Sequence, residues 1–331
     1  MTEQMTHRER LYAALACEEV DRTPISLWRH FGGIDMTAAG LSDAMVGLQT
    51  EYDFDFVKFM PTGTYPIMDW GGKTVWEPNH RGIRTVVSLP VSEPSDWERL
   101  VELDTSHGML GVVNEALAQT IKRLGPDTPV FQTIFSPLTT ARKLAGDAAL
   151  AHLRQEPAAF SAGMHTIAAV TRRLIADAVD RGADIFYAVQ NGSAEVLTRD
   201  EFMRWEFEYA QTLLRTVPAG TRIILHSHGD HLWFDELADW PVHGINWDGQ
   251  EFGLARARER TTKSLLGGIP AQSVLRNGTT EQVRQTVIAA MADVPRGLVI
   301  TPGCVIATDT PPHLMRAARA AVDVPQTAVP A

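Results

Sequence analysis

Two histidines and one cysteine are the residues whose types and spacing best suit metal binding. His226 and His228 are two residues apart at the end of a short apolar segment, and Cys304 follows Pro302-Gly303 much later in the chain. Side chains two apart on a β-strand point to the same side, so both imidazoles can face one point. Two imidazoles and a thiolate suit zinc with a fourth position open. The alternative is a hydrogen-bonded strand end and a buried, unreactive cysteine.

Two carboxylates lie close to these histidines in the sequence. Asp248 is about twenty residues beyond His228, at the end of the next apolar segment, and Asp230 follows His228 almost directly. Asp248 is expected to be a fourth ligand or to orient a ligand by hydrogen bonding. Asp230 is expected to orient a ligand or to act as a general base.

Four further polar residues are candidates for contacting a substrate. Arg29 and Lys58 follow apolar segments and can hold a carboxylate or phosphate, and the alternative is a salt bridge to the acidic stretch 53–55. Gln190 and Asn191 follow another such segment and are expected to make polar contacts.

Apolar, strand-like segments recur along the chain with helical patterns between them, which favours parallel strands joined by helical crossovers. We count eight: Ile25–Trp28, Phe56–Met60, Val130–Phe135, Ile185–Val189, Ile223–Leu225, Val242–Asn246, Ser264–Gly268 and Leu298–Thr301. The helical patterns include residues 6–19, Pro157–Arg181, Arg199–Val217 and Thr279–Asp293.

Eight such units predict a (β/α)₈ TIM barrel, an α/β fold, as a single domain over residues 1–331. The competing doubly wound fold is disfavoured because no glycine-rich phosphate turn follows the first strand. An N-terminal helix precedes the barrel, residues Lys73–Val91 are expected to form an inserted hairpin after the second strand, and residues 324–331 a frayed tail. The candidate residues follow strands, so they meet at the carboxyl end where barrel active sites lie.

Composition narrows the classes of partner. The net charge is −10 and no basic cluster stands out, which disfavours nucleic-acid binding. The 331 residues contain no apolar run of membrane-spanning length and no signal-peptide pattern at the start, so we expect no membrane association. Two cysteines cannot form a disulfide framework, which fits a cytoplasmic protein.

The sequence resembles the uroporphyrinogen decarboxylase superfamily over nearly its whole length. The resemblance begins with RERLYAALACEEVDRTPISLWRHFGG and continues through YDFDFVKFMPTGTY, FSPLTTARKLAG and GADIFYAVQNGSAE. It ends with GINWDGQ, LLGGIPAQSVLRNGTTEQV and LVITPGCVIATDTPPHLM. The superfamily has a (β/α)₈ barrel and also contains corrinoid-dependent thiol methyltransferases, so the resemblance implies the same fold and an enzyme.

The decarboxylase pattern is incomplete in this chain. Decarboxylases of the family bind an octa-acidic tetrapyrrole without a cofactor, using arginines after the first strand and a carboxylate after the second. Arg29 matches the first arginine, but Gly33 stands at the second and 59–61 (Phe-Met-Pro) where the carboxylate is expected. The tyrosine after the third strand is missing, with Arg142 or Lys143 near its place.

The methyltransferase pattern fits better. That branch binds zinc through His-x-Cys after the fifth strand and a cysteine after the eighth. His226 matches the histidine and Cys304 the distal cysteine, while His228 stands where the branch has cysteine. Imidazole in place of thiolate leaves the metal one charge more positive, hence a stronger Lewis acid.

The sequence therefore predicts a zinc-dependent methyl or alkyl transferase that acts on a small molecule, with a thiol or an oxygen-ligated group as acceptor. The resemblance also implies a corrinoid or other methylated cosubstrate, a corrinoid protein as partner, and a homodimer. The alternatives are a metal-free decarboxylase of the uroporphyrinogen type and a non-enzymatic barrel that binds a small molecule or a corrinoid.

Overall fold

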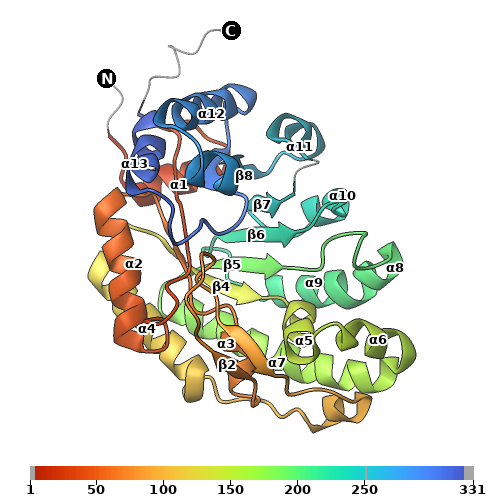
Figure 1. Cartoon of the computed structure of the whole chain (residues 1–331). Coiled ribbons are helices and arrows are strands. Elements are labelled where there is room, and N and C mark those ends of the chain that lie inside the picture. Colours follow the sequence, from red (N-terminus) through yellow and green to blue (C-terminus); the bar gives the residue numbers. More distant parts are fainter. Residues whose placement is uncertain (1–3, 250–251, 324–331) are drawn as a thin grey trace.

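The core of the molecule is a curled sheet of seven parallel strands. The computed structural model describes residues 4–249 and 252–323. In spatial order the strands are β1 (Val57–Phe59), β4 (Val130–Phe135), β5 (Asp184–Val189), β6 (Ile223–His228), β7 (Gly244–Asp248), β8 (Ser264–Ile269) and β9 (Leu298–Pro302). Figure 1 shows these strands in the middle of the molecule with helices on the outside. The predicted (β/α)₈ architecture is confirmed, with β6 three residues longer than expected.

The predicted first strand, Ile25–Trp28, is wrong in one respect, because only Ile25 pairs as a strand residue. Ile25 forms a parallel bridge to Ile300 of β9, supported by backbone hydrogen bonds from Ser26 to Ile300 and from Ile300 to Pro24. On the β1 side, side chains replace most of the ladder. The Asp55 carboxylate accepts from the Ile25 N–H, and the Ser26 hydroxyl donates to the carbonyl of Phe56.

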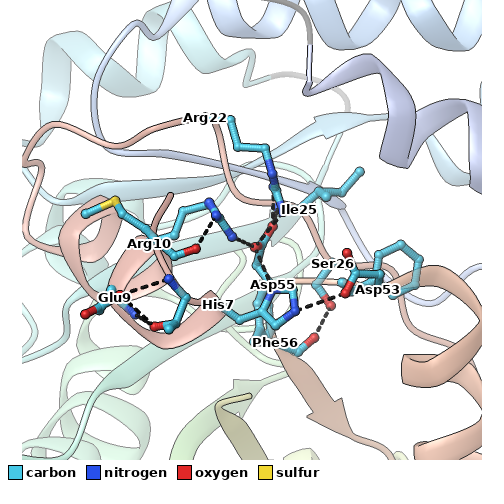
Figure 2. Close-up of polar contacts among 12 residues, drawn as sticks. His7, Glu9, Arg10, Arg22, Ile25, Ser26, Asp53, Asp55 and Phe56 are labelled. Atoms are coloured by element: carbon cyan, nitrogen blue, oxygen red, sulfur yellow. Dashed lines mark hydrogen bonds and ion pairs between the residues drawn. The ribbon is translucent and has the colours of Figure 1, made fainter. Parts of the chain in front are cut away.

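Asp55 is the centre of a buried ionic network at the amino ends of the strands. Its carboxylate is fully buried and accepts from Arg10 at 2.7 Å and from Arg22 at 2.7 Å, and His7 Nδ1 lies 3.1 Å away (Figure 2). Arg10 also binds Asp21 at 2.6 Å. The network ties the N-terminal helix, the bridge segment and β1 together, which closes the ring of strands.

Helices cover the outside of the sheet. The longer ones are α1 (His7–Leu15), α2 (Ala38–Tyr52), α4 (Gly108–Leu124), α5 (Pro137–Ala145), α6 (Ala148–Gln155), α7 (Pro157–Asp180), α12 (Thr280–Asp293) and α13 (Pro312–Ala321). The shorter ones are α3 (Tyr65–Met68), η1 (Pro94–Arg99), α8 (Arg199–Phe202), η2 (Met203–Phe207), α9 (Glu208–Leu214), α10 (Phe234–Ala238), α11 (Leu254–Arg260) and η3 (Ala271–Arg276).

Most of the predicted helices are confirmed, with local differences. The start of α12 is capped as expected, because Thr279 Oγ1 accepts from the Gln282 N–H and Gln282 Oε1 accepts from the Thr279 N–H. The predicted helix 199–217 contains a π-helical turn, η2, between α8 and α9. None of the described helices is long and apolar enough to cross a membrane. The expected frayed tail, residues 324–331, lies outside the described residues.

The predicted hairpin is present and lies over the carboxyl ends of the strands. It pairs β2 (Lys73–Val75) with β3 (Thr85–Ser88) in antiparallel fashion. A Cβ atom at Gly32 would lie 2.0 Å from the ring of Trp76, so only glycine allows this contact with the loop after the bridge segment. The tip is fixed by a hydrogen bond of 2.8 Å from the Thr308 N–H to the carbonyl of His80.

Replacing Asp55 by asparagine is expected to destabilise the protein by about 3–5 kcal/mol, because Arg10 and Arg22 would lose the fully buried carboxylate that they share and keep only Asp21 and Asp323, which are less buried. The control is Asp53→Asn, since Asp53 is largely exposed and pairs with Arg319 at the surface, where the effect is about 1 kcal/mol or less. Urea unfolding of both variants measures the difference. Equal midpoints for the two variants would contradict the role assigned to Asp55.

The same network predicts how stability depends on pH. Burial alone would raise the pKa of Asp55. Hydrogen bonds and charges from His7 and Arg22 have the larger, opposite effect, and the resulting pKa is about 2. Since this lies below the unfolded value of about 3.9, the stabilisation is complete above about pH 4 and is lost as the pH falls towards 2. The stability difference between wild type and Asp55→Asn should shrink over that interval, and a difference independent of pH would argue against it.

Candidate metal centre

His226, His228 and Cys304 come together at the carboxyl ends of β6 and β9, as predicted. One ligand atom from each of the three lies within 4.8 Å of the others. Zinc–nitrogen and zinc–sulfur bonds of about 2.0–2.3 Å place the ligands of one ion roughly 4 Å apart, so the three donors fit one metal after small shifts. Three protein ligands leave one coordination position for a further ligand.

Asn246 fixes which nitrogen of His226 can bind a metal. The amide nitrogen of Asn246 donates to the carbonyls of Leu266 and Pro302, both at 3.0 Å, so its Oδ1 faces the histidine. This oxygen lies 2.6 Å from Nδ1 of His226 and can only accept, so Nδ1 carries the proton. The lone pair is therefore on Nε2, which is free for a metal.

His228 is oriented in the same way by Asp248. The sheet register places Asn246 opposite His226 and Asp248 opposite His228. Asp248 Oδ2 lies 3.4 Å from Nδ1 of His228, while Nε2 of His228 lies 2.9 Å from the sulfur of Cys304. Two imidazoles on β6 are thus each backed by an oxygen on β7. Asp248 therefore contacts His228 on the side of the ring away from Cys304.

The surroundings of the cluster shift the pKa values of all three groups. Burial lowers the pKa of His226 well below its ordinary value, which keeps this imidazole neutral. Burial raises the pKa of Cys304, but the charge and hydrogen bond of His228 and the charge of Lys58 lower it by more. Burial lowers the pKa of His228, but the charge and hydrogen bond of Cys304 and the charge of Asp248 raise it by more.

Lys58 is buried close enough to Cys304 for their charges to interact, and it makes no salt bridge to a carboxylate among the described residues. Its ammonium lies 4.1 Å from the ring centre of Phe186 and 4.7 Å from that of Trp28. Burial lowers its pKa to about 8, although Cys304 raises it. Lys143 on α5 lies 4.4 Å from the ring centre of Phe135, and burial lowers its pKa to about 8 as well. This side of the site is basic, and the sequence analysis did not assign Lys143 to it.

The salt bridges proposed as an alternative for Arg29 and Lys58 are wrong. Asp55 pairs instead with Arg10 and Arg22, and Asp53 with His7 and Arg319. The guanidinium group of Arg29 is also engaged within the protein. It donates to the carbonyl of Thr308 at 2.9 Å and lies over the ring of Phe31. Arg29 therefore supports the wall of the mouth beneath the hairpin.

Asn191 is part of a buried network at the ends of β4 and β5. Its oxygen accepts from Arg142 at 2.9 Å and its nitrogen donates to Thr139 at 3.3 Å, so both ends of the amide are in use. Glu206 of the π-helical turn accepts from Ser136 at 3.0 Å within the same network, and burial raises its pKa to about 8. Gln190 is half-buried beside Asn191, and its backbone N–H donates to Thr139.

Asp230 lies in the loop that follows the two histidines. The Ser193 hydroxyl donates to the backbone carbonyl of Asp230, which links this loop to the end of β5. A Cβ atom at Gly249 would lie 3.4 Å from Asp230 Oδ1, so the carboxylate is adjacent to the residue that follows Asp248.

Comparison with known proteins decides the family. The sequence profile described as "Uroporphyrinogen decarboxylase (URO-D)" matches residues 6–324. The chain belongs to the uroporphyrinogen decarboxylase family. The resemblance inferred from the sequence motifs is therefore confirmed.

Within the uroporphyrinogen decarboxylase family, the curated relatives are methyltransferases. The methylcobamide:CoM methyltransferase MtbA of Methanosarcina acetivorans is 24% identical over 94% of this chain and 95% of its own length. MtbA of Methanosarcina mazei is 23% identical with the same coverage. A solved methyltransferase structure from Methanosarcina mazei superposes with a TM-score of 0.85 at 20% identity, covering 97% of this chain and 99% of that one. These relatives agree with the predicted branch.

Replacing Asn246 by alanine is expected to weaken metal binding by about 10- to 100-fold, because Nδ1 of His226 would lose the acceptor that orients the ring. Competition titrations against a chromophoric chelator measure the affinity for zinc. Ser227→Ala is the matched control, since Ser227 lies between the two histidines on the opposite face of β6. An Asn246→Ala variant that binds zinc as tightly as the control would refute the role assigned to Asn246.

Proposed function

We propose that this protein is a zinc-dependent methyltransferase that transfers a methyl or other small alkyl group to a thiol. The proximity of Nε2 of His228, the sulfur of Cys304 and the oriented ring of His226 is the observation that carries the proposal. The curated relatives are named as methyltransferases that act on methylcobamide and CoM, which supports the same reaction class.

His226, His228 and Cys304 would hold the zinc ion, with Asp248 orienting His228. A zinc ion held by these residues would supply Lewis acidity, which favours the deprotonated form of a thiol or hydroxyl group. The substrate thiol would give its proton to Asp230 or to solvent, and its sulfur would attack the methyl carbon. The carbon–sulfur bond forms as the bond to the donor breaks, and the donor keeps that electron pair. A corrinoid is the proposed donor, carried by a partner protein or supplied free.

The remaining residues would bind and orient the substrate. Lys58 is the best placed to hold an anionic group, because it is 5% exposed and makes no salt bridge to a carboxylate among the described residues. Gln190 is proposed to contact the substrate directly. Asn191 and Arg29 are already engaged within the protein, so they position Arg142 and the hairpin respectively. Asp230 is proposed to accept the thiol proton or to pass it to solvent.

His228 would give this site a different character from one with two thiolates. A neutral imidazole leaves the bound metal one charge more positive, which makes a bound thiolate less nucleophilic and an oxygen ligand more polarised. An oxygen-ligated substrate is therefore the variant to test beside thiols.

Purified protein is expected to contain about one zinc ion per chain, because its three donors suit tetrahedral zinc. The Cys304→Ala and His226→Ala variants should lose the metal, whereas Ser227→Ala should retain it. Elemental analysis of protein prepared without chelator provides the measurement. Metal-free wild-type protein would defeat the proposal.

Incubation with methylcobalamin and 2-mercaptoethanesulfonate is expected to demethylate the corrinoid, because a metal held at this site would favour the thiolate form of the acceptor, which is the nucleophile. The absorbance change of the corrinoid follows the reaction, which Cys304→Ala should abolish and Ser227→Ala should not. Uroporphyrinogen assayed in parallel tests the decarboxylase alternative. Conversion of uroporphyrinogen to coproporphyrinogen, insensitive to chelators, would favour that alternative instead.

A further inference from the structure

A cavity of about 740 Å³ adjoins the proposed metal centre, and Lys58 is not among the residues that line it. It lies between the ends of β7 and β8, the loop after β9, and the helix α12. Asp248, Gly303 and Cys304 line it, so one wall of the cavity is part of the metal cluster. Its volume is in the range of pockets that hold small molecules.

The lining of this cavity is apolar and acidic. Its larger apolar side chains include Trp247, Leu266, Ile269 and Val305, and its two carboxylates are Asp248 and Asp293. The described residues that line it include no lysine, arginine or histidine. An anion placed here would be desolvated next to carboxylates with no cation to compensate, which is unfavourable.

Glycines at the end of β8 shape the cavity. A Cβ atom at Gly268 would lie 2.7 Å from the Cβ of Ala290, so α12 packs directly on the strand there. At Gly267, the nearest atom to an added Cβ would be Leu254 Cδ2, 3.6 Å away, so a side chain could be accommodated there. Because glycine has no side chain, this space next to Leu254 stays open. The cavity wall is thus backbone and small side chains at its narrow end.

The two sides of the metal cluster differ in charge. Lys58 and Lys143 lie on one side, both near enough for the charge of Cys304 to raise their pKa values. The cavity beside α12 lies on the other side and contains only carboxylates among its charged groups in the described chain. A ligand that occupies both sides must be anionic at the end near the two lysines and uncharged at the end in the cavity.

We propose that the cavity between β8 and α12 binds the uncharged, largely apolar body of the small substrate whose sulfur or oxygen atom reaches the metal, a body the size of about one aromatic ring with its substituents. This inference rests on the proposed function in one respect, namely that the reacting atom reaches a metal held by Cys304. The binding itself depends only on the shape and charge of the cavity.

The test uses two probes of similar size and the same ring, the neutral 4-methoxybenzyl alcohol and the anionic 4-methoxybenzoate, with the full-length protein. Thr286 and Ala289 of α12 line the cavity, and Ala292 lies on the same helix outside the lining. Thr286→Trp and Ala289→Trp fill the space from two positions, so failure of one variant to fold leaves the other. Ala292→Trp is the matched control. Calorimetric titration measures binding, and zinc content is determined on every preparation.

The alcohol is expected to bind wild type and Ala292→Trp equally. For either filled variant, its dissociation constant should be at least about tenfold higher. Any binding of the benzoate should be unchanged by the filling variants. The proposal is overturned if the alcohol does not bind at about 10 mM, if filling has no effect, or if both probes lose affinity alike. Normal zinc content in the filled variants separates this result from failure of the metal centre.

Discussion

The carboxylate of Asp55 is the constraint on which the barrel depends. It is buried at the amino ends of the strands and binds two arginines and the backbone N–H of Ile25. Without this contact the bridge segment would have no hydrogen-bonding partner for that N–H, since the ladder to β1 is incomplete there. The ion pairs stabilise the closed ring, in which the bridge segment joins β9 to β1 and the ends of β6 and β9 come together at Cys304.

The site at the opposite end of the strands depends on register rather than on charge. The pairing of β6 with β7 aligns His226 with Asn246 and His228 with Asp248. Each imidazole is therefore held by its Nδ1, and both Nε2 atoms face the space beside Cys304. Stability is concentrated at one end of the barrel and chemistry at the other, as in barrel enzymes generally.

The sequence was sufficient for most of the strands, for their order and for the proximity of His226, His228 and Cys304, because apolar segments and the two-residue spacing are local signals. It was not sufficient for Ile25–Trp28, where side chains of Asp55 and Ser26 replace a ladder that apolar residues alone would predict. Asn246 was visible as a polar strand end, but its role depends on which residue of β6 lies opposite. Lys143 comes from a helix, and no pattern along the chain relates it to Lys58.

Arg29 and Asn191 show a second limit of sequence-based reasoning. Both have the residue type and position of a substrate contact, yet Arg29 binds the Thr308 carbonyl and Asn191 binds Arg142 and Thr139. A polar side chain at a strand end can hydrogen-bond to neighbouring protein segments as readily as it can contact a ligand. Hydrogen-bond partners contributed by distant segments decide between these roles.

The backing of each β6 imidazole by a residue of β7 has an evolutionary consequence. Position 228 needs only a metal-binding atom at the same height above the sheet, since the backbone around it is held by the pairing with Asp248. If the proposed metal binds there, exchange between cysteine and histidine at this position would alter the charge on the metal while the strand pairing stays as it is. One substitution would then retune the reactivity of the proposed centre without rebuilding the barrel.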